Sequence, residues 1–460
     1  MPTHARLLHD PPLTSIDQYM AIGGGNGLAG ARHLGARGTI AEISEAGLRG
    51  RGGAGFPTGT KWRSVAAGGA GARYAVVNAA EGEPGTFKDR ALLRANPYAV
   101  IEGLLIAAHA VGATEAYLAM KASFTTELGR VRGALGEVEA AGWLDGVRIT
   151  VVTGPEEYLF GEEKALLEVI EGNEPLPRWL PPYLHGLFAT GPQLGWSSGP
   201  GQVDDDLPEP NPTLVNNAET LAQAAWIMAN GAEAFRSLGT EGSPGTVLCT
   251  IVGDVERPAV IEVPMGTTLG EVVAACGGPR DGHRVKAIFP GVASSVLGEA
   301  ALDTPLTYEH LEAAGSGLGA GGFIVYDDSA CMVEVAHMLS RFLWVESCGQ
   351  CPPCKLGTGA ITAALDRIRV GRGDDSDLGT IEERLRIVTD GNRCYLPVQE
   401  QILISSILRT FPSDVAAHLE GWCPSERRHL PTPKLVDLAD GVATYDERQD
   451  RKRPDWTYAD

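Results

Sequence analysis

Four cysteines restrict what this chain can fold into more than any other feature of its sequence. Cys348, Cys351 and Cys354 form a C-x2-C-x2-C run, and Cys394 follows forty positions later. Three thiolates at this spacing can bind one side of an iron–sulfur cubane, and a distant fourth can complete it. Structural zinc sites more often pair two separate C-x2-C motifs. The spacing therefore favours a [4Fe-4S] cluster held by these four residues, with structural zinc as the alternative.

The remaining composition indicates an acidic protein with reduced thiols. Eight cysteines in 460 residues, several of them clustered, do not suit a disulfide framework. The formal charge of -20 repels phosphate backbones, which argues against nucleic-acid binding. The most apolar stretch, 100–111, contains Glu102 and His109, and the first residues include no apolar secretion core. We expect a cytoplasmic protein without direct membrane insertion, which could still lie at the periphery of a membrane complex.

Hydrophobic patterning divides the chain into regions of different texture. In the first half, short β-prone runs alternate with helical patterns, which indicates an open α/β sheet. From residue 245 short strands dominate, and from Cys331 to about Glu420 the pattern is helical. The glycine-rich start reads as an extended arm, and the charged end reads as a docking or loose tail. Strands are expected at 74–78, 116–120, 147–153, 246–253, 259–263, 285–289 and 322–326, and helices at 39–48, 97–111, 125–141, 158–171 and 268–276.

A glycine-rich loop follows the first of these helices. Gly50, Gly52 and Gly55 form a G-x-G-x-x-G pattern, but a dinucleotide fingerprint would follow a strand and open a helix. An ordinary Rossmann site is therefore disfavoured. Bare glycine N–H groups with Lys61 nearby can still hold a phosphate or a flat ring, although a plain glycine turn explains the loop equally well.

Acidic and amide side chains supply further candidates. Glu81 and Glu83 lie in a tight turn, and Glu162 and Glu163 begin a helical pattern, where acids also stabilise the helix dipole. The pair 216–217, Asn-Asn, can likewise act as a helix cap. None of these residues identifies a function by itself.

Long motifs occur in a fixed order between Ile40 and Cys394. They read GLRGRGGAGFPTG at 47–59, KW at 61–62, EGEPG at 81–85, KDR at 88–90, GEE at 161–163, NN at 216–217 and ESCGQC at 346–351. In order and spacing they resemble the flavoprotein subunit of respiratory complex I and the related diaphorase subunits of hydrogenases and formate dehydrogenases.

The resemblance implies an NADH dehydrogenase of the diaphorase type. Such a chain oxidises NADH by hydride transfer to FMN and passes single electrons through a [4Fe-4S] cluster to a partner iron–sulfur subunit or a ferredoxin, within a multi-subunit redox complex. With the textures above, it implies an N-terminal arm (1–38), an α/β domain for FMN and NADH (39–242), an SLBB-like β-grasp domain (243–330), a four-helix cluster domain (331–425) and a charged tail (426–460).

Site residues follow from the resemblance by position. Phe56 would face the nicotinamide, and Glu83 would lie in the same pocket. The cluster ligands would be the four cysteines already named. The expected FMN contacts are Gly50, Gly52, Gly53, Lys61, Asn78, Glu81, Gly161, Glu162, Glu163, Asn216 and Asn217.

Several departures from the family pattern lie on the nucleotide side. Ala80 replaces an acid, Ser64 replaces an aromatic that stacks on adenine, and Leu180 and Tyr183 replace a lysine and a phenylalanine. Losing one aromatic stack removes about 1 kcal/mol. The segment 193–211 also looks longer than is usual in the family. Two alternatives therefore stay open: an electron conduit or structural subunit that has lost NADH oxidation, and a flavoenzyme with another donor such as a ferredoxin.

Overall fold

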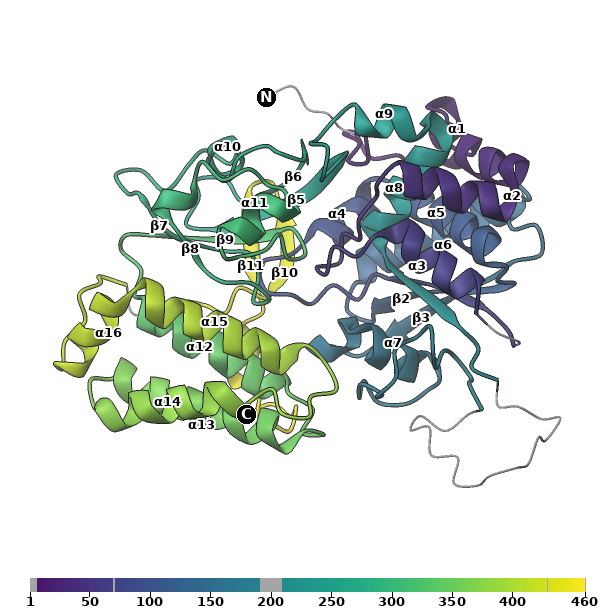
Figure 1. Ribbon diagram of the computed structural model, residues 1–460. Helices are drawn as coiled ribbons and strands as arrows, with labels where there is room; N and C mark the ends of the chain where they lie inside the picture. Colours follow the sequence, from purple (N-terminus) through teal and green to yellow (C-terminus); the bar gives the residue numbers. More distant parts are fainter. Residues whose placement is uncertain (1–5, 69–70, 191–208, 428, 460) are drawn as a thin grey trace.

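The structure, a computed structural model, describes residues 6–68, 71–190, 209–427 and 429–459. The N-terminal half forms an α/β body, and a small β-rich domain and a helical bundle lie beside it (Figure 1). Most of the segment expected near the pocket mouth, residues 193–208, lies outside the described residues.

A four-stranded parallel sheet forms the centre of the α/β body. Its strands are β1 (Tyr74–Asn78), β2 (Glu115–Lys121), β3 (Arg148–Gly154) and β4 (Thr213–Asn217), in the order β3-β2-β1-β4. Both β2 and β4 pair with β1 in parallel. The predicted α/β class is confirmed, but β4 was missed, because this short strand directly follows a proline-rich segment.

Helices cover this sheet, and glycines let some of them approach closely. α5 (Pro97–Val111) begins behind the cap Asn96, and Gly112 in the left-handed region caps its end. A Cβ on Gly103 would lie 2.0 Å from the Leu221 carbonyl oxygen, so α5 and α8 meet backbone to backbone. The helices of the body after the glycine loop are α3 (Thr58–Ala66), α4 (Lys88–Ala95), α5 (Pro97–Val111), α6 (Thr125–Ala140), α7 (Glu163–Ile170), α8 (Ala218–Asn230) and α9 (Ala232–Arg236).

The N-terminal region is helical and not the extended arm that its glycines suggested. α1 (Ile16–Ala21) and α2 (Asn26–Glu45) precede the sheet, and α2 is kinked at Gly35 with φ 68°. A Cβ on Gly27 would lie 2.5 Å from the Ala225 carbonyl oxygen. These glycines allow helices to pack closely, whereas a high glycine content alone suggests a loop.

The β-rich domain is a mixed five-stranded sheet in the order β6-β5-β9-β7-β8. This domain matches the small α+β domain expected from the sequence. It extends from the loop after α9 to the start of the helical bundle. Its elements are β5 (Thr246–Gly253), β6 (Ala259–Pro264), α10 (Leu269–Ala275), β7 (Val285–Phe289), β8 (Leu297–Gly298), α11 (Tyr308–Ala313) and β9 (Gly322–Asp327).

The bundle consists of α12 (Met332–Glu346), α13 (Pro352–Arg369), α14 (Asp375–Ile387) and α15 (Leu396–Thr410), with the short α16 (Pro412–Leu419) after them. Cys331 caps α12, and prolines stand in the first turns of α13, α15 and α16. None of the described helices has by itself the length and apolar composition of a membrane span. The sharply bent pair α4 and α5 has them only when both helices are taken together.

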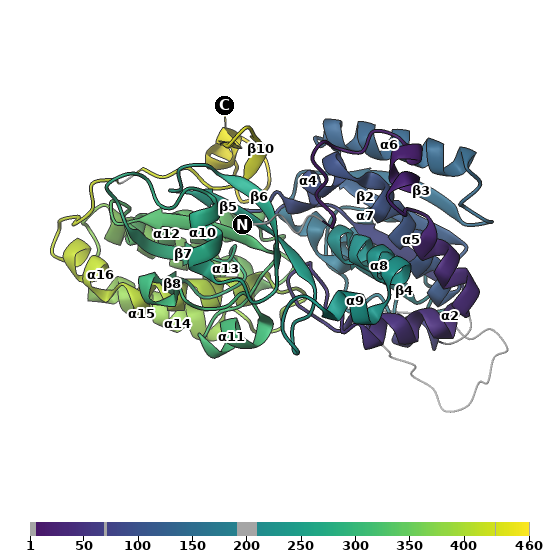
Figure 2. The ribbon, with the colours of Figure 1, turned by 90° about the horizontal axis from the view of Figure 1, so that it is seen from above.

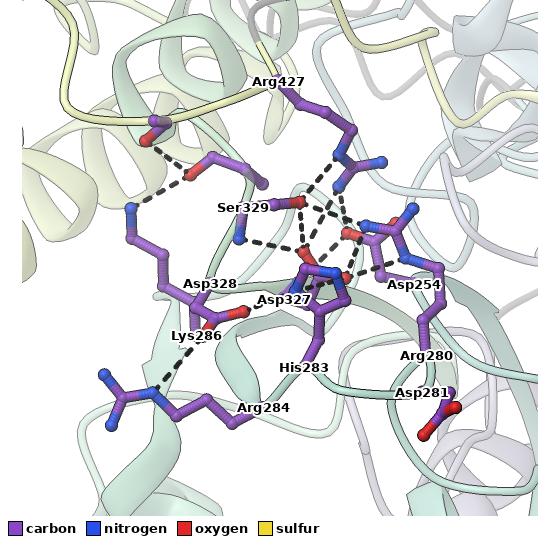
Figure 3. A network of polar contacts seen from close by, with 12 residues as sticks. Asp254, Arg280, Asp281, His283, Arg284, Lys286, Asp327, Asp328, Ser329 and Arg427 are labelled. Carbon is purple, nitrogen blue, oxygen red and sulfur yellow. Dashed lines mark hydrogen bonds and ion pairs between the residues drawn. The ribbon is translucent and has the colours of Figure 1, made fainter.

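The charged C-terminal segment is folded onto the molecule instead of being loose. It forms the hairpin β10 (Leu435–Ala439) and β11 (Val442–Tyr445) and a 3-10 turn at Glu447–Arg451. In Figures 1 and 2 this yellow segment lies where the α/β body meets the other two domains. Its beginning is held by Arg427, whose guanidinium contacts Asp254 and lies 3.7 Å from Asp327 in a charged network that includes Arg280 (Figure 3).

Candidate functional site

The sheet places two amides side by side at its carboxyl edge. Asn78 ends β1 and Asn217 ends β4, and the two residues are register partners. From β1 the sheet continues to β2 and β3 on one side, while β4 returns on the other. Ligands of open α/β sheets bind outside the carboxyl ends of the strands at such a reversal of strand order. The region outside the carboxyl ends of β1 and β4, which we call the crevice, is therefore the candidate site.

The glycine loop lies against this crevice. A Cβ on Gly52 would stand 3.1 Å from the Asn217 Cβ, and one on Gly55 would stand 2.4 Å from the Tyr308 ring. Gly53 has φ +124°, a conformation that other residues rarely adopt. The buried Arg51 guanidinium donates to the Thr246 carbonyl at 3.0 Å and so ties the loop to the β-rich domain.

Charged and amide groups surround the loop. Lys61 Nζ lies 2.7 Å from Glu163 Oε2, and Asn78 Nδ2 donates to the Gly161 carbonyl at 2.7 Å. Glu162 caps α7 by accepting two backbone N–H groups, and burial raises its pKa to about 7. The structure thus brings together the residues expected at 61, 78 and 161–163.

The two asparagines at 216 and 217 are fixed from behind. Asn216 accepts a hydrogen bond from Trp62 Nε1 at 2.8 Å. Asn217 accepts from the backbone of Glu219 as the cap of α8, and it donates to Asp89 at 2.6 Å. Asn217 therefore caps a helix, as expected, and it also lies at the carboxyl edge of the sheet.

Glu81 faces the start of α4. Its carboxylate accepts the backbone N–H groups of Asp89 and Arg90 at 3.2 and 3.3 Å. Burial and the neighbouring Asp89 raise its pKa to about 7, although Lys88 opposes the shift. This carboxyl can change protonation near neutral pH at the edge of the crevice.

The two residues expected near the nicotinamide differ in exposure. Phe56 is 52% exposed at the end of the glycine loop. The Glu83 carboxylate accepts the backbone N–H of Val292, from the β-rich domain, at 2.7 Å and the hydroxyl of Tyr158, from the α/β body. Sequence reasoning missed Tyr158 because neither motif nor spacing distinguishes it from a core tyrosine.

The residues at the crevice suit FMN. Glycine N–H groups and the Lys61 ammonium can bind a phosphate, and the amides of Asn78 and Asn217 can hydrogen-bond a flavin ring. A side chain at Gly52 would crowd the surface of Asn217, so the loop remains thin where a flat ring would approach.

The four cysteines meet between the helices of the bundle. Cys348 and Cys351 lie in the loop between α12 and α13, Cys354 in the first turn of α13, and Cys394 just before α15. Burial raises the pKa of Cys354 to about 11 and raises that of Cys394 further, with Coulombic contributions from neighbouring thiols in both cases. The thiols of Cys348 and Cys351 act electrostatically on Cys354, and those of Cys348 and Cys354 act on Cys394, so the four thiols form one group.

A second cluster of possible metal ligands, two cysteines and a histidine, was not expected from the sequence. Cys331, His418 and Cys423 have donor atoms within 4.8 Å of one another, and Cys331 Sγ lies 3.2 Å from His418 Nε2. Their positions, 87 residues apart for the first two, give no local motif. Cys423 is thereby placed in a group separate from the four cluster cysteines.

Three family models match the chain in order. They are the Nuo51 FMN-binding domain over residues 43–226, the SLBB domain over 248–291 and the NADH-ubiquinone oxidoreductase-F iron–sulfur binding region over 334–418. These matches confirm the expected FMN domain, SLBB domain and iron–sulfur region.

Whole-length relatives agree with these models. An F-type NADH-quinone oxidoreductase subunit of Rhizobium meliloti is 37% identical over 390 residues, which cover 82% of this chain and 88% of that protein. The NADP-reducing hydrogenase subunit HndC of Solidesulfovibrio fructosivorans is 35% identical over 437 residues, covering 93% and 84%. A chain of an NAD+-reducing [NiFe]-hydrogenase in the H2-reduced state superimposes with a TM-score of 0.72 at 31% identity. That match covers 87% of this chain but 64% of the hydrogenase chain.

Proposed function

The chain belongs to the family of the F-type NADH-quinone oxidoreductase subunits and their hydrogenase relatives, and from this we propose how its residues serve NADH oxidation. It is an FMN- and [4Fe-4S]-dependent NADH dehydrogenase subunit that passes electrons to a separate iron–sulfur protein. When bound, FMN accepts a hydride from NADH and can release electrons one at a time. The observation that supports this most is the pairing of Asn78 with Asn217 beneath the glycine loop.

On the side where electrons enter, residues of this chain hold and orient FMN. We assign the phosphate of FMN to Lys61 and the glycine N–H groups, and the ring to the amides at the ends of β1 and β4. Glu163 holds the Lys61 ammonium at 2.7 Å, so the cation is already in place before a ligand binds. The remaining assigned contacts are Gly50, Gly52, Gly53, Glu81, Gly161, Glu162 and Asn216.

The nucleotide approaches from the exposed end of the glycine loop. Phe56 offers an exposed ring there, and Glu83 is held by Tyr158 and Val292 on the other side. Ser64, in the position of the expected adenine stack, is exposed and donates its hydroxyl to the Thr60 carbonyl. Binding of the nicotinamide half therefore relies on Phe56 and Glu83, while the adenine half lacks an aromatic side chain at position 64 for stacking.

On the exit side, Cys348, Cys351, Cys354 and Cys394 are assigned as the cluster ligands. The relatives are subunits of NADH-quinone oxidoreductases and of a hydrogenase. The electron acceptor is accordingly another polypeptide of a multi-subunit complex.

Anaerobic titration of the purified protein with NADH tests this function. We expect the flavin absorbance to bleach with NADH, and a parallel titration with NADPH separates the two nucleotides. FMN that stays oxidised at saturating NADH would refute NADH oxidation. Bleaching by a reduced ferredoxin in that case would establish the alternative donor.

A further inference from the structure

The C-terminal segment connects the entry site to the exit site. At one end, Gly85 of the EGEPG turn donates its N–H to the Pro433 carbonyl at 2.7 Å, and Arg90 donates to the carbonyls of Leu435 and Val436. Arg94 and Asp437 pair at 2.7 Å. We call residues 433–459 the strap.

The other end of the strap covers the loop that holds the cluster. Arg341 of α12 donates to the carbonyls of Gln449, Asp450 and Lys452 at 3.2, 2.8 and 2.9 Å. Lys355, next to Cys354, donates both to the Ser347 carbonyl and to the Pro454 carbonyl at 2.6 Å. The backbone of the strap is therefore bonded to the residues on both sides of the cysteine run.

A fully buried ion pair lies at the centre of this contact. Lys452 Nζ is 2.9 and 3.0 Å from the two carboxylate oxygens of Glu346, and neither side chain is exposed. Glu346 stands two positions before Cys348, and it also accepts the Gln449 amide and the Tyr158 N–H. A carboxylate left unpaired at such a position would be strongly destabilising.

Other charges near Glu346 do not replace this pair. Lys434 bonds Gln449 at 3.0 Å and lies 3.6 Å from Asp446, and Lys121 donates to the Glu156 carbonyl. Glu157 lies 3.9 Å from Lys452 and adds a second negative charge. Among the residues that the structure describes, Lys452 is the cation that forms an ion pair with Glu346.

We propose that Lys452 is a positioning residue for the cluster, because its ammonium neutralises Glu346 beside Cys348 and thereby sets the reduction potential of the [4Fe-4S] centre. A negative charge near the cluster disfavours its reduced form, and a positive charge favours it. The inference rests on the proposed cluster site. It adds a role for the strap that the family assignment does not contain.

Two single variants give shifts of opposite sign. Lys452→Met leaves Glu346 uncompensated, so the midpoint potential of the cluster should become more negative when EPR redox titration is performed at an alkaline pH that keeps the unpaired carboxylate ionised. Glu346→Gln leaves Lys452 uncompensated, so the midpoint should become more positive. A loosened loop would move both variants in the same direction, which separates the charge effect from damaged packing.

The controls use the same segment. Arg451→Met removes an exposed cation next to Lys452 and should leave the midpoint unchanged, and Lys452→Arg should retain it. The double variant Glu346→Gln/Lys452→Met carries no unpaired charge and should return toward the unmodified value, even if one single variant fails to fold.

The outcomes are distinguishable from failure of the cluster assignment. An unmodified protein without four irons would refute the proposed site, whatever the variants do. A full iron complement with coinciding midpoints in all variants, or with shifts of the same sign in both single variants, would refute the role of Lys452 alone.

Discussion

Tyr158 donates its hydroxyl to the Glu83 carboxylate and accepts a hydrogen bond from Gln399 of α15 at 2.7 Å. Glu83 belongs to the α/β body, while Gln399 lies five positions after Cys394 in the helical bundle. One tyrosine thus connects the pocket assigned to the nicotinamide with the helix that follows the last cluster ligand. Burial raises the pKa of Glu83, and the Tyr158 hydrogen bond opposes that rise.

Replacing Tyr158 with phenylalanine should slow the entry of electrons without removing the flavin. The variant leaves a buried carboxylate oxygen without its donor, which costs about 1 to 3 kcal/mol. Because the pKa of Glu83 then rises further, the acid limb of the rate of flavin reduction by NADH should move to higher pH. Stopped-flow reduction across pH measures it. Tyr117→Phe, which removes a hydroxyl bonded to Glu115 of the same strand, β2, is the control. Identical pH profiles for both variants would contradict the assignment.

Replacing Lys61 with methionine should weaken FMN binding. Lys61 pairs with Glu163, and the variant loses a charged donor for the phosphate, worth about 1.5 to 3 kcal/mol, or about ten- to a hundredfold in affinity. Fluorescence titration of the apoprotein with FMN measures the dissociation constant. Arg63→Met on the same helix, where the guanidinium bonds Ser44, should leave the constant within about twofold. Equal affinities of both variants would remove Lys61 from the phosphate site.

Replacing Cys394 with serine should abolish the intact cluster. Cys394 is the distant fourth ligand, and a serine oxygen is a poor substitute for a thiolate on iron. Iron analysis and the EPR spectrum of the reduced protein should show loss of the four-iron signal while FMN stays bound. Cys276→Ser, at the end of α10 in the SLBB domain, should retain all iron. A full four-iron complement in the Cys394 variant would contradict the ligand set.

Elements whose limits are set by neighbouring residues were predicted correctly from the sequence. The strand at Tyr74–Asn78 and the helix at Pro97–Val111 have the predicted limits, because a run of buried β-prone residues and a Pro start with a Gly end are local signals. The motifs also predicted that Asn78 and Asn217 belong to one site, which their pairing supports.

Features that depend on distant contacts were not predictable. The glycines of α2 resemble a loop until Gly27 is seen against the backbone of α8. Lys452 resembles any exposed lysine of a charged tail, and its burial against Glu346, 106 positions earlier, becomes visible in the fold alone. The cluster of Cys331, His418 and Cys423 was not predictable for the same reason, because its residues lie far apart in the sequence.

The stability of the bundle should fall as the pH rises toward the alkaline side, and Glu400 should be one cause. This carboxyl is fully buried in α15, accepts a hydrogen bond from Ser340 at 2.6 Å, and burial raises its pKa to about 8. A raised acid pKa means that the folded state holds a proton that the unfolded state has released above its ordinary pKa. The contribution is therefore lost progressively between the ordinary value and about pH 8, by about 2 kcal/mol from about pH 6 to about pH 8.

Glu400→Gln keeps an acceptor for Ser340 and cannot ionise, so its unfolding midpoint should depend less on pH than that of the unmodified protein. Thermal unfolding followed by circular dichroism at about pH 6 and about pH 8 measures the difference. Glu420→Gln, at an exposed position after α16, should preserve the unmodified pH dependence. Parallel pH curves for the Glu400 variant and the unmodified protein would show that this carboxyl does not govern the loss.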